Sequence, residues 1–517
     1  MQAQAPPPVI ARQPSQPPAP PPEPIPFSAV PLPGEMEPPP PDLLDTAESP
    51  GLSDAEVREK SRIIKETLAQ FGLPVEVVEV RRGPTVTQFG VAPGFTERTG
   101  PNGKRRPHKV RVSQIAALAD DLALALAAPS LRVEAPVPGR SVVGIEVPNE
   151  EIGLVTLRSV MESEMFQALS TPLAVALGED VAGSPVAADL GMMPHLLIAG
   201  TTGSGKSVCI KAIATCLAMT NRPDELRMVM IDPKMVELVR FNGLPHLLGH
   251  TEVELDRIGR VLRWVAHEMD GRYKKFAATG ARHLDDYNYK VGRRDPEKRL
   301  PRIVVLIDEL ADLMMLAPEE TERTICRIAQ MARATGIHLV VATQRPSTDV
   351  VTGLIKANFP ARISFATASQ VDSRVILDMP GAETLLGRGD MLYLAADAGH
   401  PVRVQGCYVS EEEIGRLVDF WRSQTPGWPA EPPWEPMMRG GAEGGAIGGK
   451  DEEDDLLEQA VQLLRTRRTI SASYLQRRLR VGYPRAARLM EQLEEMGLVG
   501  PPEAAGRPRR VIGGESD

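Results

Sequence analysis

Short runs of consecutive apolar residues alternate with longer amphipathic stretches in the central part of this chain, from about residue 149 to residue 436. A continuous apolar run is typical of a strand buried on both faces of a parallel sheet, and amphipathic stretches are typical of the helices that cover it. The alternation therefore predicts an α/β domain. The predicted strands are 195–199, 227–231, 303–307, 338–343 and 362–366.

Residues 51–148 have a different pattern, which predicts a small α+β domain. A helix is expected to begin at Ser53, because Glu56 follows three residues later, as in a capping box. Shorter apolar segments after this helix predict strands. The expected strands are 75–80, 85–91, 131–135 and 142–147, with an extended segment at 110–112 and a helix over 113–127. No residue of this domain has a catalytic pattern.

A Gly-rich and acidic linker at residues 437–452 leads into a compact last segment, residues 453–517. This segment predicts three helices and a hairpin in the order of a winged helix-turn-helix domain. The predicted helices are 456–465, 471–479 and one that opens at Pro484, and the predicted wing has its strands at Val499 and 510–512.

The third helix of this segment has an apolar face made by Leu489, Leu493 and Met496, which we expect to face the core. Arg485, Arg488 and Glu491 fall outside that face, and the whole segment is rich in arginine. A helix-turn-helix with a basic surface is typical of a DNA-reading module. The alternative is a solvated, arginine-rich helical cap.

Residues 1–50 are dominated by proline, with few apolar side chains that could form a core. This composition predicts a disordered, partly extended linker. A docking strip for a partner is the alternative, although no motif in the segment favours it. A linker at the start of a chain either follows a part of the protein that once preceded it or is a free tail.

Charge and cysteine content narrow the class of protein further. The net charge of −9 excludes a uniformly basic nucleic-acid-binding protein, and the four cysteines show no C-x-x-C pair, which predicts buried thiols in a reducing cytosol. The absence of any run of about 18 apolar residues predicts that nothing in this chain spans a membrane. We therefore expect a cytoplasmic protein, associated with a membrane only if an N-terminal transmembrane part is missing from this chain.

The strongest chemical signal is the pattern G-x-x-x-x-G-K-S at residues 200–207, directly after the predicted strand 195–199. Glycines let the backbone approach a ligand, and the N–H groups of such a loop bind phosphate together with the positive end of the next helix. Lys206 would reach the β- and γ-phosphates of ATP, and the Ser207 hydroxyl would hold Mg²⁺. The residues expected to bind the nucleotide are Gly200, Thr201, Thr202, Gly203, Ser204, Gly205, Lys206, Ser207, Val208 and Asp308.

Two acidic residues, Asp308 and Glu309, end the predicted strand 303–307. Ligands of parallel sheets gather at the carboxyl ends of strands, so we expect this pair beside the phosphate loop. Asp308 would hold Mg²⁺ through a water molecule, and Glu309 would orient and deprotonate the attacking water. Together with the loop, the pair predicts an ATP-hydrolysing enzyme.

Two other strand ends leave alternatives open. Asp232, after the strand 227–231, either lies near the nucleotide or caps the next helix. Gln344, after the strand 338–343, either senses the γ-phosphate or lies in an ordinary exposed turn. We include Gln344 among the expected catalytic residues.

Taken together, these motifs resemble those of the DNA translocases of the FtsK/SpoIIIE family. The resemblance extends from about Ser53 to Ile512. The resemblance is specific, because a protein that shared only the phosphate loop with this family would not be expected to contain the other motifs. The segments that carry it are 196–207, 231–234, 307–313, 332–339, 342–346, 352–358 and 387–392.

The resemblance implies a small α domain, a RecA-like β motor domain and a winged-helix γ domain, with the motors in a homo-hexameric ring around double-stranded DNA. It also implies that Arg333 acts in trans, as an arginine finger on the neighbour's nucleotide, which agrees with the ability of a guanidinium to stabilise charge on a transferring phosphoryl group. Pore loops near Lys356 and Arg362 would contact DNA phosphates, and such contacts are independent of sequence.

In the γ domain, the resemblance implies that Arg485, Arg488 and Glu491 contact DNA and that the domain reads polar DNA signals. Arginine pairs with guanine and glutamate with cytosine in major-groove contacts. One departure concerns Pro484, because the family often has asparagine there, so the DNA signal that is read stays open. The other is that the family usually carries membrane helices before a Pro-rich linker, whereas this chain has only the linker.

The implied function is ATP-driven movement of double-stranded DNA in chromosome segregation, coupled to cell division or sporulation. A site-specific recombinase is a partner that the sequence neither requires nor excludes. Two alternatives stay open from the residues alone. One is a related motor of secretion or conjugation, and the other is a non-enzymatic DNA-binding scaffold in which ATP only locks the assembly.

Overall fold

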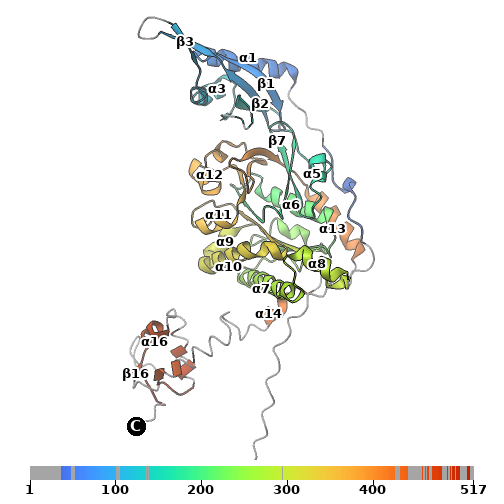
Figure 1. Ribbon diagram of the computed structural model, residues 1–517, viewed down its shortest axis with the longest axis vertical. Coiled ribbons are helices and arrows are strands. Elements are labelled where there is room, and N and C mark those ends of the chain that lie inside the picture. The colour runs from blue at the N-terminus through green and yellow to red at the C-terminus, as the bar shows by residue number, and fades with distance from the viewer. Residues whose placement is uncertain are drawn as a thin grey trace, which may run out of the picture. The chain divides into compact units, whose positions relative to one another are not determined.

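The computed structural model divides into two compact units, Met1–Glu435 and Pro436–Asp517, which we describe separately (Figure 1). Unit 1 contains a four-stranded sheet and a nine-stranded sheet. The structure describes residues 36–47, 53–99, 105–135, 137, 139–293, 295–425, 431–439, 457, 460–461, 463–464, 469–479, 486, 489–490, 492–494, 496–500 and 509–512.

The four-stranded sheet of unit 1 is antiparallel and has α1 (Asp54–Gln70) packed on it. Helix α1 begins with the expected capping box, in which the Ser53 hydroxyl accepts from the Glu56 N–H and the Glu56 carboxylate accepts from the Ser53 N–H. Ile64 and Leu68 of α1 are fully buried in the core of this layer. The strand order is β1 (Val75–Arg82), β2 (Val86–Pro93), β6 (Val143–Pro148) and β5 (Arg132–Glu134), which confirms the predicted α+β class.

Two details of the α+β prediction were wrong. The expected helix 113–127 is two short helices, α2 (Val112–Ala116) and α3 (Ala119–Ala125), and Val112, the last residue of the expected extended segment 110–112, already belongs to α2. A hairpin of β3 (Phe95–Thr99) and β4 (Arg105–Lys109) was not predicted. It forms a separate two-stranded sheet with charged side chains in both strands, so it shows no alternation of apolar and polar residues.

The nine-stranded sheet contains the five predicted strands as a parallel core. They are β10 (Leu226–Ile231), β11 (Arg302–Ile307), β12 (Ile337–Thr343), β9 (His195–Ala199) and β13 (Ala361–Phe365), in that spatial order. Four further strands extend the sheet beyond β13 and were not predicted. They are the antiparallel β14 (Asp390–Leu394), β15 (Val402–Gly406), β7 (Ala174–Asp180) and β8 (Pro185–Asp189).

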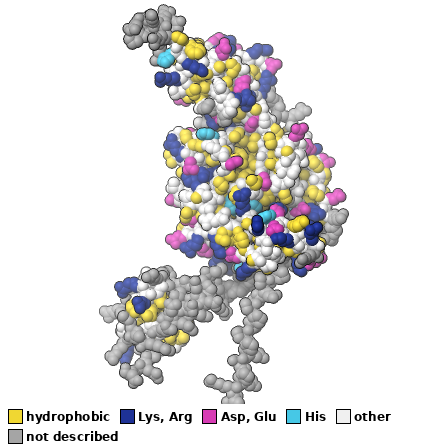
Figure 2. Space-filling model, viewed as in Figure 1, with side chains coloured by type: hydrophobic (Ala, Val, Ile, Leu, Met, Phe, Trp, Pro, Cys, Tyr) yellow, Lys and Arg dark blue, Asp and Glu magenta, His cyan; other side chains and the backbone are white. Residues whose placement is uncertain are grey.

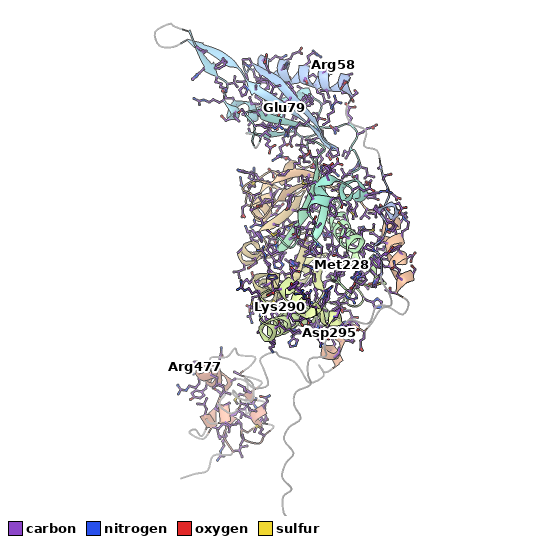
Figure 3. The ribbon with its side chains drawn as sticks, turned by 45° about the vertical axis from the view of Figure 1, so that its right-hand side comes forward. Arg58, Glu79, Met228, Lys290, Asp295 and Arg477 are labelled. Atoms are coloured by element: carbon purple, nitrogen blue, oxygen red, sulfur yellow. The ribbon has the colours of Figure 1, made fainter. Side chains whose placement is uncertain are left out.

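Helices cover both faces of the large sheet (Figure 1). One face carries α4 (Leu157–Met161), α5 (Glu164–Ala168), α6 (Lys206–Thr220) and α13 (Glu411–Gln424). The other carries α7 (Leu255–Thr279), α9 (Leu310–Leu316), α10 (Pro318–Met331) and the short η4 (Ala332–Thr335). Met228 of β10, labelled in Figure 3, is fully buried between these layers. The predicted α/β layering is confirmed, and it leaves the carboxyl ends of the parallel strands available for a site.

Residues 36–47 contradict the prediction that the whole of 1–50 is disordered. This segment, which we call the N-terminal strap, buries Met36 and Leu44 in the core of the large-sheet layer and forms the short helix η1 (Pro41–Leu43). The Asp45 N–H donates to Glu413 of α13 at 2.9 Å, and its carboxylate pairs with Arg416 at 2.8 Å. Prolines lose little conformational freedom on ordering, which lowers the entropic cost of fixing the strap by these contacts. The rest of that prediction lies outside the described residues.

Unit 2 contains α16 (Ala472–Leu479) and a pairing of β16 (Thr469–Ile470) with β17 (Arg509–Arg510). An antiparallel bridge between Val499 and Val511 lies where the wing was predicted. Leu489 and Leu493 are buried in the core of unit 2 as expected, but Met496 is 55% exposed. Met496 lies in the turn that Gly497 makes with a φ of 72°, so it leaves the helical face that the spacing predicts.

Candidate nucleotide site and DNA contacts

The glycine loop joins β9 to α6 in the predicted order of strand, loop and helix. Gly205 has a φ of 117°, and a Cβ there would lie 2.6 Å from the backbone nitrogen of Gly389. The Gly389 N–H in turn donates to the Ser204 carbonyl at 2.8 Å. A Cβ at Gly200 would lie 2.6 Å from the Cβ of Phe365 in β13. Glycine at both positions therefore lets the loop close onto the strands beside it.

A cavity of about 460 Å³ opens beside this loop. Of the predicted site residues, it is lined by Thr201, Thr202, Gly203, Gly205, Lys206, Ser207, Val208 and Gln344. Gln344 is joined to the loop directly, because its side-chain oxygen accepts from the Thr202 hydroxyl at 2.9 Å. The structure thus brings the loop and the end of β12 together in one site.

Lys206, the first residue of α6, is buried against the end of β11. Its ammonium donates to the Asp308 carboxylate and to the Asp308 carbonyl, at 2.7 Å in each case. Both side chains are 2% exposed. Burial raises the pKa of the Asp308 carboxyl, and the charge of Lys206 offsets this only in part. The loop lysine and the strand-end carboxylate therefore form one buried pair.

Glu309 is held by donors from two neighbouring strand ends. Its carboxylate accepts from the Lys234 ammonium at 2.7 Å, from the Thr343 hydroxyl at 2.7 Å and from the Gln344 N–H at 3.1 Å. Burial by itself raises the pKa of Glu309, but the hydrogen bonds from Lys234 and Thr343 outweigh it, so the pKa lies below its usual range. The structure keeps this carboxylate charged and fixed in orientation.

Lys234 is a site residue that sequence analysis missed. The signal was its place in Asp232-Pro233-Lys234, directly after the strand β10. Asp232 itself acts as a cap, because its carboxylate accepts from the backbone N–H groups of Lys234, Val236, Glu237 and Leu238 at 2.9 to 3.2 Å. The carboxylate of Asp232 thus shapes the turn that directs Lys234 to Glu309.

Arg333 lies at the opposite end of the sheet from the glycine loop. It is exposed on η4, which precedes β12, and β12 runs parallel to β9. The length of β9, five residues at roughly 3.3 Å each, separates that end from the loop. A second cavity of about 590 Å³ lies there, lined by Arg333 together with Tyr273, Arg282 and Arg302. Arg333 therefore does not face the glycine loop of its own chain.

Lys356 and Arg362 share one acidic partner, Asp378. The Lys356 ammonium lies 2.7 Å from one carboxylate oxygen and the Arg362 guanidinium 2.6 Å from the other. Arg362 also donates to three backbone carbonyls, those of Lys356 and Phe359 at the end of α11 (Gly353–Asn358) and that of Ile376 in α12 (Gln370–Leu377). The Arg362 side chain is only 12% exposed, so this arginine connects two helix ends rather than projecting outward.

The predicted DNA-contacting residues of unit 2, Arg485, Arg488 and Glu491, lie outside the described residues. Figure 2 shows Lys and Arg side chains on the described surface of unit 2. Arg477 and Arg478 of α16 are exposed, and Arg477 is labelled in Figure 3. All four cysteines of the chain are buried free thiols, as expected.

A parallel sheet with a glycine loop at the end of β9 and a carboxylate pair at the end of β11, separated by β12, defines a P-loop nucleotide-binding domain. Family models for the FtsK alpha domain, the FtsK/SpoIIIE family and the Ftsk gamma domain match residues 38–149, 156–348 and 451–513. The chain belongs to the FtsK/SpoIIIE family. Membership of this P-loop family implies that the chain binds a nucleotide.

Two curated relatives show the extent of the similarity. The DNA translocase FtsK of Caldanaerobacter subterraneus subsp. tengcongensis is 48% identical over 480 residues, which cover 93% of this chain and 64% of the relative. The DNA translocase SpoIIIE of Bacillus subtilis is 46% identical over 461 residues, which cover 88% of this chain and 56% of the relative. The chain thus spans less than two thirds of the length of these relatives.

Among solved structures, the conjugation coupling protein TcpA of pCW3, in monomer form with ATPgS, superimposes with a TM-score of 0.47 at 21% identity. The match covers 70% of this chain and 99% of that chain, and a similarity this low supports no functional conclusion. Within the part of the chain that the structure describes, no helix has the length and apolar character needed to cross a membrane.

Proposed function

We propose that this chain hydrolyses ATP to move double-stranded DNA, and that it works as a hexameric ring in chromosome segregation during cell division or sporulation. The observation that carries the proposal is the pair of contacts at the end of β11, Lys206 with Asp308 and Lys234 with Glu309, beside a glycine loop. The membership of the chain in a family whose matching relatives are described as DNA translocases supports the choice of polymer.

Binding of ATP would change the partner of Lys206. The loop N–H groups and the N-terminus of α6 attract the phosphates, and the Lys206 ammonium would leave Asp308 for them, because a triphosphate carries more negative charge than one carboxylate. Ser207 and Asp308, the latter through water, would then hold Mg²⁺, since their hard oxygen atoms are ligands that this cation prefers. When bound, Mg²⁺ neutralises charge on the phosphates.

Glu309 is the proposed base for hydrolysis. A base must be ionised and correctly oriented before it can take a proton from water, and Lys234 and Thr343 supply both conditions. Gln344 would report the state of the γ-phosphate to the loop, through its bond with Thr202. These proposed roles use side chains at the ends of β10, β11 and β12 and one hydroxyl of the glycine loop.

The position of Arg333 agrees with a ring of subunits. Because this arginine lies at the far end of the sheet from the glycine loop of its own chain, it can act on a nucleotide only from a neighbouring subunit. We therefore propose Arg333 as the arginine finger of the next subunit, where it would stabilise charge on the transferring phosphoryl group.

We propose Lys356, Arg485, Arg488 and Glu491 as the residues that contact DNA. Lys356 would exchange its contact with Asp378 for a DNA phosphate, while Arg362 positions the two helix ends and acts on DNA through them. Contacts to phosphates are independent of base sequence, as a motor requires. Direction along the chromosome would come from the base contacts of unit 2.

Duplex-dependent ATP hydrolysis tests this function. The ATPase rate of the full chain is measured with and without linear duplex DNA, at low and at physiological salt. We expect duplex DNA to raise the rate, and we expect the stimulation to fall with salt, because phosphate contacts release counterions. A hydrolysis rate that duplex DNA does not change at either salt concentration would contradict the proposal.

Two variants serve as controls for this experiment. Lys206→Ala should abolish hydrolysis by removing the phosphate ligand, whereas Glu309→Gln should bind ATP but hydrolyse it at least about 100-fold more slowly, in line with the contribution of a general base. Replacement of the duplex by a single strand of equal length tests the choice of polymer.

A further inference from the structure

The short helix η4, which carries Arg333, is held by side chains of the long helix α7. Tyr273 of α7 donates its hydroxyl proton to the Met331 carbonyl at 2.6 Å. Arg272, the residue before it, donates from its guanidinium to the Thr335 carbonyl at 2.8 Å. Met331 lies two positions before Arg333, and Thr335 lies two positions after it. The backbone on both sides of Arg333 is therefore fixed to one neighbouring helix.

Arg272 is itself held in place on several sides. Its side chain is fully buried, and its charge is paired with Glu268 of the same helix at 2.8 Å. The guanidinium also donates to the carbonyl of Pro301, directly before β11, at 2.8 Å. A buried guanidinium keeps such partners because each unmade bond would leave a polar group without water or a substitute. Arg272 thus joins η4 to the beginning of β11, the strand that ends at Asp308 and Glu309.

The guanidinium of Arg333 has no such support. The residue is exposed, and within the part of the chain that the structure describes no acceptor forms a hydrogen bond or an ion pair with this guanidinium. A guanidinium presents five donors in a planar fork, which suits it to the oxygens of a phosphoryl group. Arg333 therefore combines a fixed backbone with a side chain that is available to a group outside its own subunit.

We propose that Arg272 and Tyr273 are positioning residues for ATP hydrolysis, and that they act through Arg333 on the nucleotide of the neighbouring subunit. This inference rests on the proposed role of Arg333 in trans. A guanidinium stabilises a transferring phosphoryl group only at hydrogen-bond distance, and a displacement of about 1 Å can lower a rate about 100-fold. Neither positioning residue lines the cavity beside the glycine loop, so the affinity of their own subunit for ATP should not depend on them.

Removal of the Tyr273 hydroxyl tests this role with a small change. ATP hydrolysis by the full chain is measured at saturating duplex DNA for the wild type, Tyr273→Phe, Arg333→Ala and the double variant. We expect Tyr273→Phe to lower kcat roughly 2- to 10-fold, the factor equivalent to one hydrogen bond, with KM for ATP unchanged. In the Arg333→Ala background the same substitution should cause no further loss, because no guanidinium is left to position.

Mixed assemblies show on which subunit the defect acts. Tyr273→Phe subunits are mixed with an excess of Lys206→Ala subunits, which should hydrolyse no ATP but have an intact Arg333. Each active site then receives the arginine of a Lys206→Ala neighbour. We expect the rate per Tyr273→Phe subunit to equal that of wild-type subunits diluted in the same way. A rate that stays lower would place the defect in the subunit's own site and overturn the proposal.

Arg272→Lys tests the second positioning residue. Lysine keeps the positive charge beside Glu268, but an ammonium lacks the planar fork that donates to the Pro301 and Thr335 carbonyls together. We expect a larger fall in kcat than in Tyr273→Phe, again with KM unchanged and again recovered in the mixed assembly. If Arg272→Lys does not fold, Tyr273→Phe still decides the question.

Tyr289→Phe is the matched control, because it removes an exposed tyrosine hydroxyl at another site. Tyr289 belongs to α8 (Leu284–Gly292), and its hydroxyl accepts from Arg293 at 3.0 Å. This variant should hydrolyse ATP like the wild type, and its urea unfolding midpoint should match that of Tyr273→Phe. Equal losses of activity in Tyr289→Phe and Tyr273→Phe would contradict a role specific to η4.

Two further results would overturn the positioning role. They are an unchanged kcat in Tyr273→Phe and a loss in the double variant that equals the product of the two single losses. Failure of the proposed function looks different, because Arg333→Ala would then hydrolyse ATP at the wild-type rate, or the wild type would not hydrolyse ATP. Either of these results removes both proposals.

Discussion

Two adjacent carboxylates at the end of β11 experience opposite environments. Burial raises the pKa of Asp308, which pairs with a single cation, while hydrogen bonds hold the pKa of Glu309 below its usual range. The difference comes from Lys234, which approaches from the end of β10, and from Thr343 at the end of β12. One strand end thus provides a carboxylate that can exchange partners and another that is kept charged and fixed.

Replacement of Lys234 tests how Glu309 is positioned. Lys234→Met removes the cation that holds one carboxylate oxygen, so we expect kcat for ATP hydrolysis to fall about 10-fold or more, a part of what a general base contributes, while KM stays near its wild-type value. Steady-state kinetics measure both constants. Lys234→Arg retains the charge and should recover most of kcat, and a rise in KM without loss of kcat would contradict a positioning role.

At the scale of elements, a proline-rich segment is fixed to the large-sheet layer by a few contacts. The N-terminal strap, residues 36–47, places fully buried Leu44 beside α13, and its backbone accepts from Arg158 at Leu44 and from Arg416 at Leu43. The match to the FtsK alpha domain begins within the strap, at residue 38. The strap is therefore held to the large-sheet layer by apolar burial and by polar contacts together.

Loss of the Leu44 side chain should release the strap. Leu44→Ala leaves a cavity in a packed core, at a cost of about 2–5 kcal/mol, which exceeds what a short segment with two buried apolar side chains can offset. We expect faster amide hydrogen exchange and new proteolytic cleavage confined to residues 36–47. Asp42→Ala, at an exposed position of η1, is the control and should exchange like the wild type. Unchanged protection in Leu44→Ala would show that the strap is held by its polar contacts alone.

At the scale of unit 1, a buried ionic network joins the small sheet to the large one. Arg403 of β15 pairs with Asp390 of β14 at 2.6 Å and with Glu146 of β6 at 2.7 Å, and Glu146 also pairs with Arg132. All three side chains of the Arg403 group are at most 5% exposed. A buried pair contributes little net stability, but removal of one partner leaves charges buried without compensation.

Arg403→Met should therefore destabilise unit 1 strongly. The substitution leaves the buried Asp390 carboxylate without the Arg403 guanidinium and leaves Glu146 with Arg132 alone, and we expect a loss of about 3–5 kcal/mol in the free energy of unfolding. Urea unfolding followed by circular dichroism measures the change. Arg62→Met, which removes an exposed arginine with partners on the same helix, should leave the midpoint where it is. A small effect of Arg403→Met would mean that water reaches the junction and replaces the guanidinium.

Local patterns in the sequence determined the parallel core of the sheet, the glycine loop and the paired carboxylates, because each of these depends on a few consecutive residues and on the period of a buried strand. The capping box at Ser53 and the order of the wing strands in unit 2 could be predicted for the same reason. Local patterns could not predict which side chains from segments far apart along the chain are in contact.

Only the tertiary structure decided which groups meet. Lys234 and Glu309 lie 75 positions apart, and Arg403 and Glu146 lie 257 positions apart, so no local period brings them together. The same holds for the strap, whose composition resembles a linker although two of its apolar side chains are buried. Partners of a buried charge are chosen by the packing of whole elements, since only packing removes the water that would otherwise solvate that charge.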